Sequence, residues 1–136
     1  MENSAWARLG SPGLAPGRTG EVADALEAGR IAVSAPFLLE AGYSARDSRE
    51  HEELLAELLT LPLVSLDAEV EERALDGQSQ LARAGHHRLP PVDLLQAALA
   101  DRHGLGILHY DGDYDVIAER TDLAFTSVWL AARGSL

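Results

Sequence analysis

The feature that most constrains this chain is the stretch from Leu89 to Asp115, where a helix, a turn, a strand and a group of acids follow one another. Pro90 and Pro91 end whatever precedes them, and proline is tolerated in the first turn of a helix. Leucines and alanines then dominate as far as Gly104, a residue type that commonly follows the last turn of a helix. The stretch therefore predicts a buried helix that begins after the prolines and ends before Gly104.

A short apolar segment follows this helix and predicts an interior strand over 105–110. Asp111, Asp113 and Asp115 come directly after the strand, and Asp93 lies in the first turn of the preceding helix. Ligands of open α/β sheets gather at the carboxyl ends of strands. Carboxylates crowded there repel one another unless a cation neutralises them, so the acids favour a site for magnesium or manganese.

Elsewhere, apolar periodicity and Gly or Pro breaks predict further helices and strands in alternation. Strands that alternate with helices indicate a parallel sheet covered on both faces, so we expect one α/β domain over residues 1–136. Ser4 is expected to cap a short helix that carries Trp6, and a loop is expected over 10–20. The other expected helices cover 21–28, 35–43, 51–61, 67–84 and 116–120, and the other expected strands cover 31–34, 63–66 and 123–130.

Composition narrows the function classes. The net charge of -11 argues against a nonspecific nucleic-acid binder, which should be basic, although it leaves room for an enzyme that meets phosphates through a metal. Cysteine is absent, which excludes disulfides and thiolate ligands. No apolar run approaches the roughly 20 residues of a membrane helix, and no secretory signal is visible, so we expect a cytoplasmic protein without membrane contact.

Other interpretations of the acids were weighed. Asp93 alone is a favourable residue at a helix start, and the aspartates after the strand alone are typical of a turn. A calcium loop of the EF-hand type is disfavoured, because its sixth position is Val116 rather than glycine and its twelfth is Asp122 rather than glutamate. The histidines lack a zinc-ligand spacing, and no G-x-S-x-G motif supports a catalytic serine.

An ordered set of segments along nearly the whole chain resembles the PIN domain, specifically the VapC-type toxins of bacterial toxin–antitoxin pairs. The matching segments are Ser4 to Leu9, Leu39 to Ser44, His87-Arg88 with Pro91 to Leu95, Leu108 to Asp115, and Trp129 to Leu136.

The resemblance implies an α/β/α sandwich around a central parallel sheet. It implies a magnesium-dependent endoribonuclease that hydrolyses RNA, pairs with a small inhibitory antitoxin and forms a homodimer. The family's acids carry over to Glu40, Asp93, Asp111 and Asp113. In those roles Asp93 holds the metal together with an acid from the first strand, and Asp111 and Asp113 complete the inner shell or bind through water. Glu40 orients ligands or water.

The chain departs from the family pattern at its start. Family members open with an apolar strand that ends in aspartate, whereas here Glu2 takes the aspartate's place and almost nothing precedes it. We therefore expect a PIN-like domain without its first strand, from a start site assigned too far downstream or from a decaying gene. Two rival functions follow: an impaired PIN-like protein that only binds an antitoxin, and a phosphoesterase that acts on structured DNA, which the small size disfavours.

Overall fold

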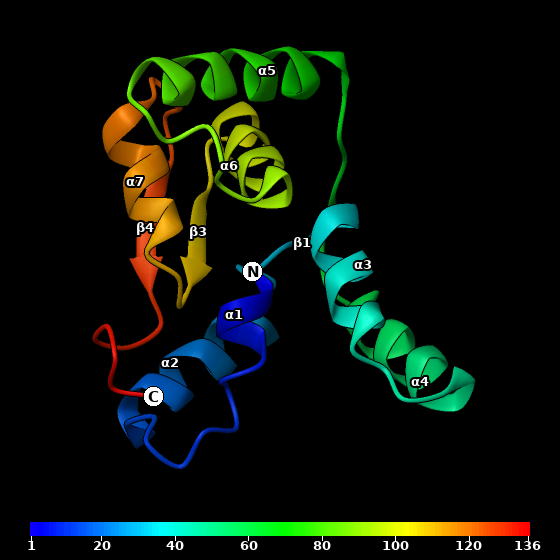
Figure 1. Ribbon diagram of the computed structural model, residues 1–136. Coiled ribbons are helices and arrows are strands. Elements are labelled where there is room, and N and C mark those ends of the chain that lie inside the picture. The colour runs from blue at the N-terminus through cyan, green and yellow to red at the C-terminus, as the bar shows by residue number, and fades with distance from the viewer.

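The computed structural model describes residues 1–136 in full and contains seven helices and four short strands (Figure 1). The helices are α1 (Asn3–Trp6), α2 (Pro16–Glu27), α3 (Ala35–Tyr43), α4 (Ser48–Leu58), α5 (Ala68–Arg83), α6 (Pro91–His103) and α7 (Asp113–Arg120). The strands are β1 (Val33–Ser34), β2 (Leu63–Val64), β3 (Gly106–His109) and β4 (Thr126–Trp129). The chain thus alternates between helices and strands, which confirms the predicted α/β class.

All strand pairs are parallel, as predicted, but they form two separate two-stranded sheets. β1 pairs with β2, and β3 pairs with β4 through four residues from Gly106 opposite Thr126 to His109 opposite Trp129. The expected single central sheet is therefore wrong in this detail. Each strand is also shorter than its apolar run, because the ends of these runs lie outside the ladders and pack as loops.

The N-terminal residues lie between the two sheets, and no strand precedes β1 (Figure 1). The ammonium group of Met1 donates a hydrogen bond to the carbonyl oxygen of Ala32 at 3.1 Å, next to β1. The backbone N–H of Glu2 donates to the carbonyl oxygen of Leu108, in β3, also at 3.1 Å. These two residues are the direct link between the sheets at the position where the resemblance implies a first strand.

The hydrophobic core has three parts. The largest joins α5, α6, β3 and α7 and includes Leu81, Leu94, Ile107, Tyr114 and Ile117. A second part lies under α1 and α2, and a third joins β1, α3 and α4 around Phe37 and Leu58. In Figure 1, α5 lies across the top beside α6, and α3 and α4 extend to the right. None of the helices is long and apolar enough to cross a membrane.

The central helix agrees closely with its prediction. α6 begins at Pro91, and Gly104 follows it in the left-handed conformation with φ 64°. α5 likewise begins after the predicted cap, since the side chain of Asp67 accepts a hydrogen bond from the Val70 N–H at 2.9 Å.

Other helices begin earlier than predicted. α2 begins at Pro16 within the expected loop, because proline suits the first helical position. α4 begins at Ser48, where Asp47 provides the cap. The cap of α1 is Glu2 instead of Ser4. The Glu2 carboxylate accepts a hydrogen bond from the backbone N–H of Ser4. α7 begins at Asp113, so Asp113 and Asp115 lie in its first turn.

Candidate metal centre

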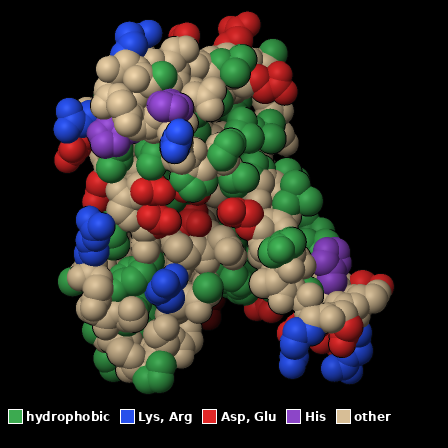
Figure 2. All heavy atoms as spheres, in the orientation of Figure 1, with side chains coloured by type: hydrophobic (Ala, Val, Ile, Leu, Met, Phe, Trp, Pro, Cys, Tyr) green, Lys and Arg blue, Asp and Glu red, His purple; other side chains and the backbone are tan.

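Three of the predicted carboxylates converge. Asp93, Asp111 and Asp113 each offer one oxygen, and these oxygens all lie within 4.8 Å of one another. Asp93 lies in the first turn of α6, Asp111 lies shortly after the end of β3, and Asp113 is the first residue of α7. The prolines at the start of α6 position Asp93, and the Asp111 carboxylate accepts a hydrogen bond from the Asp113 N–H at 3.0 Å. Acidic side chains gather near the middle of the face in Figure 2.

Asp93 lies in the most perturbed environment of the three. It is only 6% exposed. Burial, followed by the charge of Glu2, raises the pKa of Asp93 to about 7, and Asp111 and Glu40 add to this rise. A hydrogen bond from the hydroxyl of Tyr114, at 3.2 Å, acts in the opposite direction. The excess of negative charge around this buried carboxylate is the condition that a bound cation would relieve.

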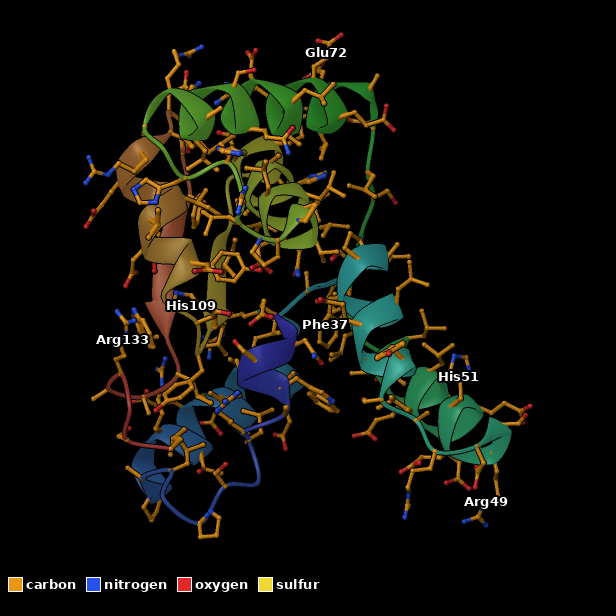
Figure 3. All side chains as sticks on the ribbon, viewed as in Figure 1. Phe37, Arg49, His51, Glu72, His109 and Arg133 are labelled. Atoms are coloured by element: carbon orange, nitrogen blue, oxygen red, sulfur yellow. The ribbon has the colours of Figure 1, made fainter.

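The environment of Asp113 also raises its pKa. Burial and the neighbouring Asp111 raise its pKa, whereas Arg133 lowers it. The guanidinium of Arg133 lies close against Gly112, where an added Cβ would come within 3.2 Å of Arg133 Cζ. Figure 3 shows Arg133 on the segment that follows β4, and Arg133 is the positive side chain that lowers the pKa of Asp113.

Glu2, a predicted metal ligand, lies beside the three aspartates but is not one of the converging group. Its buried carboxylate accepts hydrogen bonds from the N–H of Ser4, at 2.8 Å, and from the Ser4 hydroxyl. Its charge nevertheless raises the pKa of both Asp93 and Glu40. One carboxylate oxygen, Oε2, thus serves as the cap of α1.

Glu40, predicted to orient ligands or water, projects from α3 toward the same region. Burial and then the charge of Glu2 raise its pKa. Its Oε2 atom is buried and has no hydrogen-bond partner. A buried carboxylate oxygen without a donor is costly, so a cation, or a water held by one, would satisfy it.

Asp115 was grouped with the other acids in the sequence, but the structure separates it from them. Residues two apart on a helix point to different sides, so Asp115 diverges from Asp113 within α7. Asp115 instead accepts hydrogen bonds from the Ser127 hydroxyl, at 2.6 Å, and from Trp129 Nε1, at 3.0 Å. It therefore ties α7 to β4.

The sequence did not predict the two buried side chains that hydrogen-bond to the acidic residues, His109 and Tyr114. His109 is fully buried at the end of β3, and its Nε2 lies 2.7 Å from the Ser127 hydroxyl (Figure 3). Its Nδ1 accepts a hydrogen bond from the backbone N–H of Asp111 at 3.1 Å. Tyr114 is also fully buried and contacts Asp93. Nothing in the sequence reveals the pairing of His109 with Ser127 or of Tyr114 with Asp93, because these residues are 18 and 21 positions apart.

The donor set fits a hard divalent cation. Magnesium and manganese bind through one or a few carboxylates and retain water ligands. Three aspartate oxygens within 4.8 Å, the unsatisfied oxygen of Glu40 and the raised pKa of Asp93 together meet that requirement. Calcium in an EF-hand is not supported, because Asp113 and Asp115 lie in a helix rather than in a loop.

Comparisons with known proteins identify the family of this chain. Residues 16–120 match the family model described as PIN domain. Ribonuclease VapC51 of Mycobacterium tuberculosis is 41% identical over 70% of this chain and 69% of its own length. Ribonuclease VapC18 of the same organism is 32% identical over 100% of this chain and 97% of its own length.

The fold comparison points the same way. The chain superimposes with a TM-score of 0.70 on a chain of the DNA-bound VapBC crystal structure from Salmonella typhimurium, at 20% sequence identity. The overlap covers 95% of this chain and 94% of that one, so the two share a fold. The chain belongs to the PIN domain family, among its VapC-type members, which confirms the family predicted from the sequence.

Proposed function

We propose that this chain is a magnesium- or manganese-dependent endoribonuclease and the toxin of a toxin–antitoxin pair, acting in the cytoplasm. The observation that carries the proposal is the convergence of Asp93, Asp111 and Asp113, whose oxygens lie within 4.8 Å of one another. The names of the relatives, Ribonuclease VapC51 and Ribonuclease VapC18, support the same activity.

Each acid has a proposed role. Asp93, Asp111 and Asp113 hold the divalent ion, and Glu2 contributes its second oxygen or its charge from the side. When bound, the ion activates a water for attack on the phosphodiester and offsets charge on the phosphate oxygens. Glu40 accepts a hydrogen bond from that water and orients it, which would satisfy its unpartnered Oε2 atom.

The test is cleavage of a broad RNA pool with magnesium, with and without a chelator. Asp93→Asn keeps the side chain's size and its hydrogen bond with Tyr114 but removes a negative charge from the site. We expect cleavage by the native protein, loss of cleavage by Asp93→Asn, and loss of cleavage with chelator. Asp76→Asn is the matched control, because Asp76 lies exposed on α5. Equal cleavage by native protein and Asp93→Asn would remove Asp93 from the mechanism.

A partner protein is also proposed. An apolar groove of about 550 Å³ lies beside Glu40 between α3 and α6, and its lining includes Leu39, Tyr43, Leu66 and Leu95. Leu39 is 74% exposed and Tyr43 is 92% exposed. The groove would receive an amphipathic helix of the antitoxin, and an arginine from the antitoxin would reach the acids. A pull-down from the native host that recovers no small basic protein would count against this partner.

A homodimer belongs to the same proposal and rests on the family alone. Size-exclusion chromatography with light scattering measures it directly. A monomer at high micromolar concentration would contradict it.

One observation favours the impaired alternative, in which the chain only binds an antitoxin. Glu2 gives one carboxylate oxygen to Ser4 as a helix cap, and it is not one of the three converging acids. Absence of cleavage by freshly folded native protein with either metal, combined with antitoxin binding, would favour this alternative.

A further inference from the structure

A guanidinium without a carboxylate partner lies beside the acids. Arg133 follows β4, and its side chain lies over Gly112, the residue between Asp111 and Asp113 (Figure 3). A Cβ added to Gly112 would lie 3.2 Å from Cζ and 3.3 Å from both terminal nitrogens of Arg133. Gly112 has an ordinary φ of -70°, so its missing side chain matters because it lets the guanidinium approach the backbone closely.

The turn that carries Arg133 is held by Tyr110, the residue directly before Asp111. The hydroxyl of Tyr110 donates a hydrogen bond to the carbonyl oxygen of Ala132 at 3.3 Å. The same hydroxyl accepts a hydrogen bond from the backbone N–H of Leu136 at 2.7 Å. Tyr110 therefore holds the backbone on both sides of Arg133 against the end of β3.

The N–H donors of Arg133 are free to bind a ligand. The charge of Arg133 acts on Asp113, but no hydrogen bond or ion pair joins it to a carboxylate. Arg73, in contrast, donates to Asp101 at 2.9 Å and to Asp122 at 3.1 Å. Arg133 is exposed, and a guanidinium carries five N–H donors in a planar fork that matches the oxygens of a phosphate. Its position therefore suits an anion that arrives from solvent.

We propose that Arg133 binds a backbone phosphate of the RNA, next to the phosphate that is cleaved. The inference rests on the proposed nuclease function, because an ion held by Asp111 and Asp113 would place the scissile phosphate beside this guanidinium. Every nucleotide of the strand brings its own phosphate, so a strand engaged at the ion presents a neighbouring phosphate to Arg133. The net charge of -11 repels RNA from the protein as a whole, so an unpaired cation beside the site supplies local attraction.

Cleavage kinetics with magnesium test this contact on one RNA that the native protein cleaves. In Arg133→Ala the contact is lost equally from the bound substrate and the transition state. We therefore expect KM to rise about tenfold and kcat to change by less than about twofold. Arg133→Lys keeps the charge without the planar fork and should raise KM less. Arg49→Ala is the control, because Figure 3 shows Arg49 on α4, well apart from Arg133, and it should leave KM unchanged.

Equilibrium binding measures the same contact without cleavage. Fluorescence anisotropy with magnesium gives the Kd of Asp93→Asn for a labelled single-stranded RNA of mixed sequence, from about 50 to about 200 mM NaCl. Each phosphate contact on a single strand adds about 0.7 to the slope of log K against log salt. We expect Arg133→Ala, added to Asp93→Asn, to reduce that slope by about 0.7 in magnitude. Arg49→Ala, added in the same way, should leave the slope unchanged.

Tyr110 is a positioning residue in this proposal. Tyr110→Phe removes both hydrogen bonds that hold the turn, so KM should rise by about threefold or more. In the Arg133→Ala background the same substitution should leave KM unchanged, because Tyr110 acts through Arg133. Circular dichroism checks that each variant is folded. An equal rise of KM in both backgrounds would contradict the positioning role of Tyr110.

The outcomes separate this inference from the proposed function. Unchanged KM and an unchanged salt slope in Arg133→Ala, with cleavage by the native protein intact, would overturn the phosphate contact and leave the nuclease function standing. Absence of cleavage by the native protein, with the salt slope reduced by Arg133→Ala, would overturn the nuclease function and leave the phosphate contact standing. Absence of RNA binding by Asp93→Asn would overturn the phosphate contact as well.

Discussion

The hydroxyl of Tyr114 donates a hydrogen bond to Oδ1 of Asp93 at 3.2 Å, and both side chains are buried. Burial, together with the charges of Asp93 and Glu2, raises the pKa of this phenol, so it stays protonated and acts as a donor. A neutral donor can stabilise the ionised carboxylate without competing for the cation as a positive side chain would. The pair therefore keeps Asp93 available as a ligand close to neutral pH.

Replacement of this donor should shift the pH dependence of the site. In Tyr114→Phe the hydrogen bond that lowers the pKa of Asp93 is lost, so that pKa rises further above about 7. We expect the acidic limb of the cleavage profile to move up by about 0.5 to 1 pH unit and the free energy of unfolding to fall by about 1 kcal/mol. Tyr43→Phe, on an exposed tyrosine, is the control. An unchanged acidic limb would contradict the role given to Tyr114.

Asp93→Asn should stabilise the metal-free protein at alkaline pH. The folded-state pKa of Asp93 is about 7 against an ordinary value of 3.8, so the folded state binds the proton more tightly. The free energy of unfolding of the native protein therefore keeps its full value below about pH 4. It falls as the pH rises toward 7 and stays lower above pH 7. Asparagine does not ionise, so we expect a gain on the order of 2 to 4 kcal/mol over the native protein at pH 8.

Urea denaturation at pH 4 and pH 8, with a chelator present, measures this gain. The two proteins should differ little at pH 4 and clearly at pH 8. Excess magnesium should then stabilise the native protein at pH 8 by about 2.7 kcal/mol at a hundredfold excess over its Kd, and leave Asp93→Asn largely unaffected. Equal stability of both proteins at pH 8 without metal would show that Asp93 is not held in a strained ionised state.

The α-amino group of Met1 provides a second pH effect with the opposite sign. Burial lowers its pKa from 8.0 to about 6, so the folded state releases a proton that the unfolded state keeps. Above about pH 8 this group does not change the free energy of unfolding. As the pH falls toward 6, the group lowers the free energy of unfolding progressively. Acetylation of the amine removes the ionisation, so the blocked protein should gain about 1 to 2 kcal/mol over the free one at pH 6 and little at pH 8.5. A gain that is the same at both pH values would contradict the burial of the ammonium.

Much of the site could be predicted because its main parts follow from local rules. Proline at a helix start and Gly104 after its end define α6, and this places Asp93 in the first turn. The apolar strand that ends before Asp111 places the second acid at the same edge. The carboxyl ends of such elements converge in α/β proteins, so Asp93, Asp111 and Asp113 could be grouped before any coordinates were known.

Two predictions were wrong because partners distant in sequence compete for the groups concerned. Asp115 was grouped with the acids because it alternates with Asp113, but a helical start turned it toward Ser127 and Trp129. Pairing between strands is likewise a tertiary property, so the division into two sheets could not be derived from the apolar runs.

The last prediction concerns the hydrogen-bonded chain beneath Asp111. Because His109 Nδ1 accepts from the Asp111 N–H, the ring proton is on Nε2, which donates to the Ser127 hydroxyl, and that hydroxyl donates to Asp115. Burial lowers the pKa of His109, which keeps the ring neutral and able to accept.

Ser127→Ala leaves the Nε2–H without its acceptor in a buried site, so we expect a loss of about 1 to 3 kcal/mol in the free energy of unfolding. Cleavage should fall about tenfold, since outer partners orient the groups that bind metal. Ser79→Ala, on the exposed face of α5, is the matched control for loss of a serine hydroxyl. If Ser127→Ala unfolds at the same urea concentration as that control, the hydrogen bonds that join His109, Ser127 and Asp115 do not hold Asp111 in place.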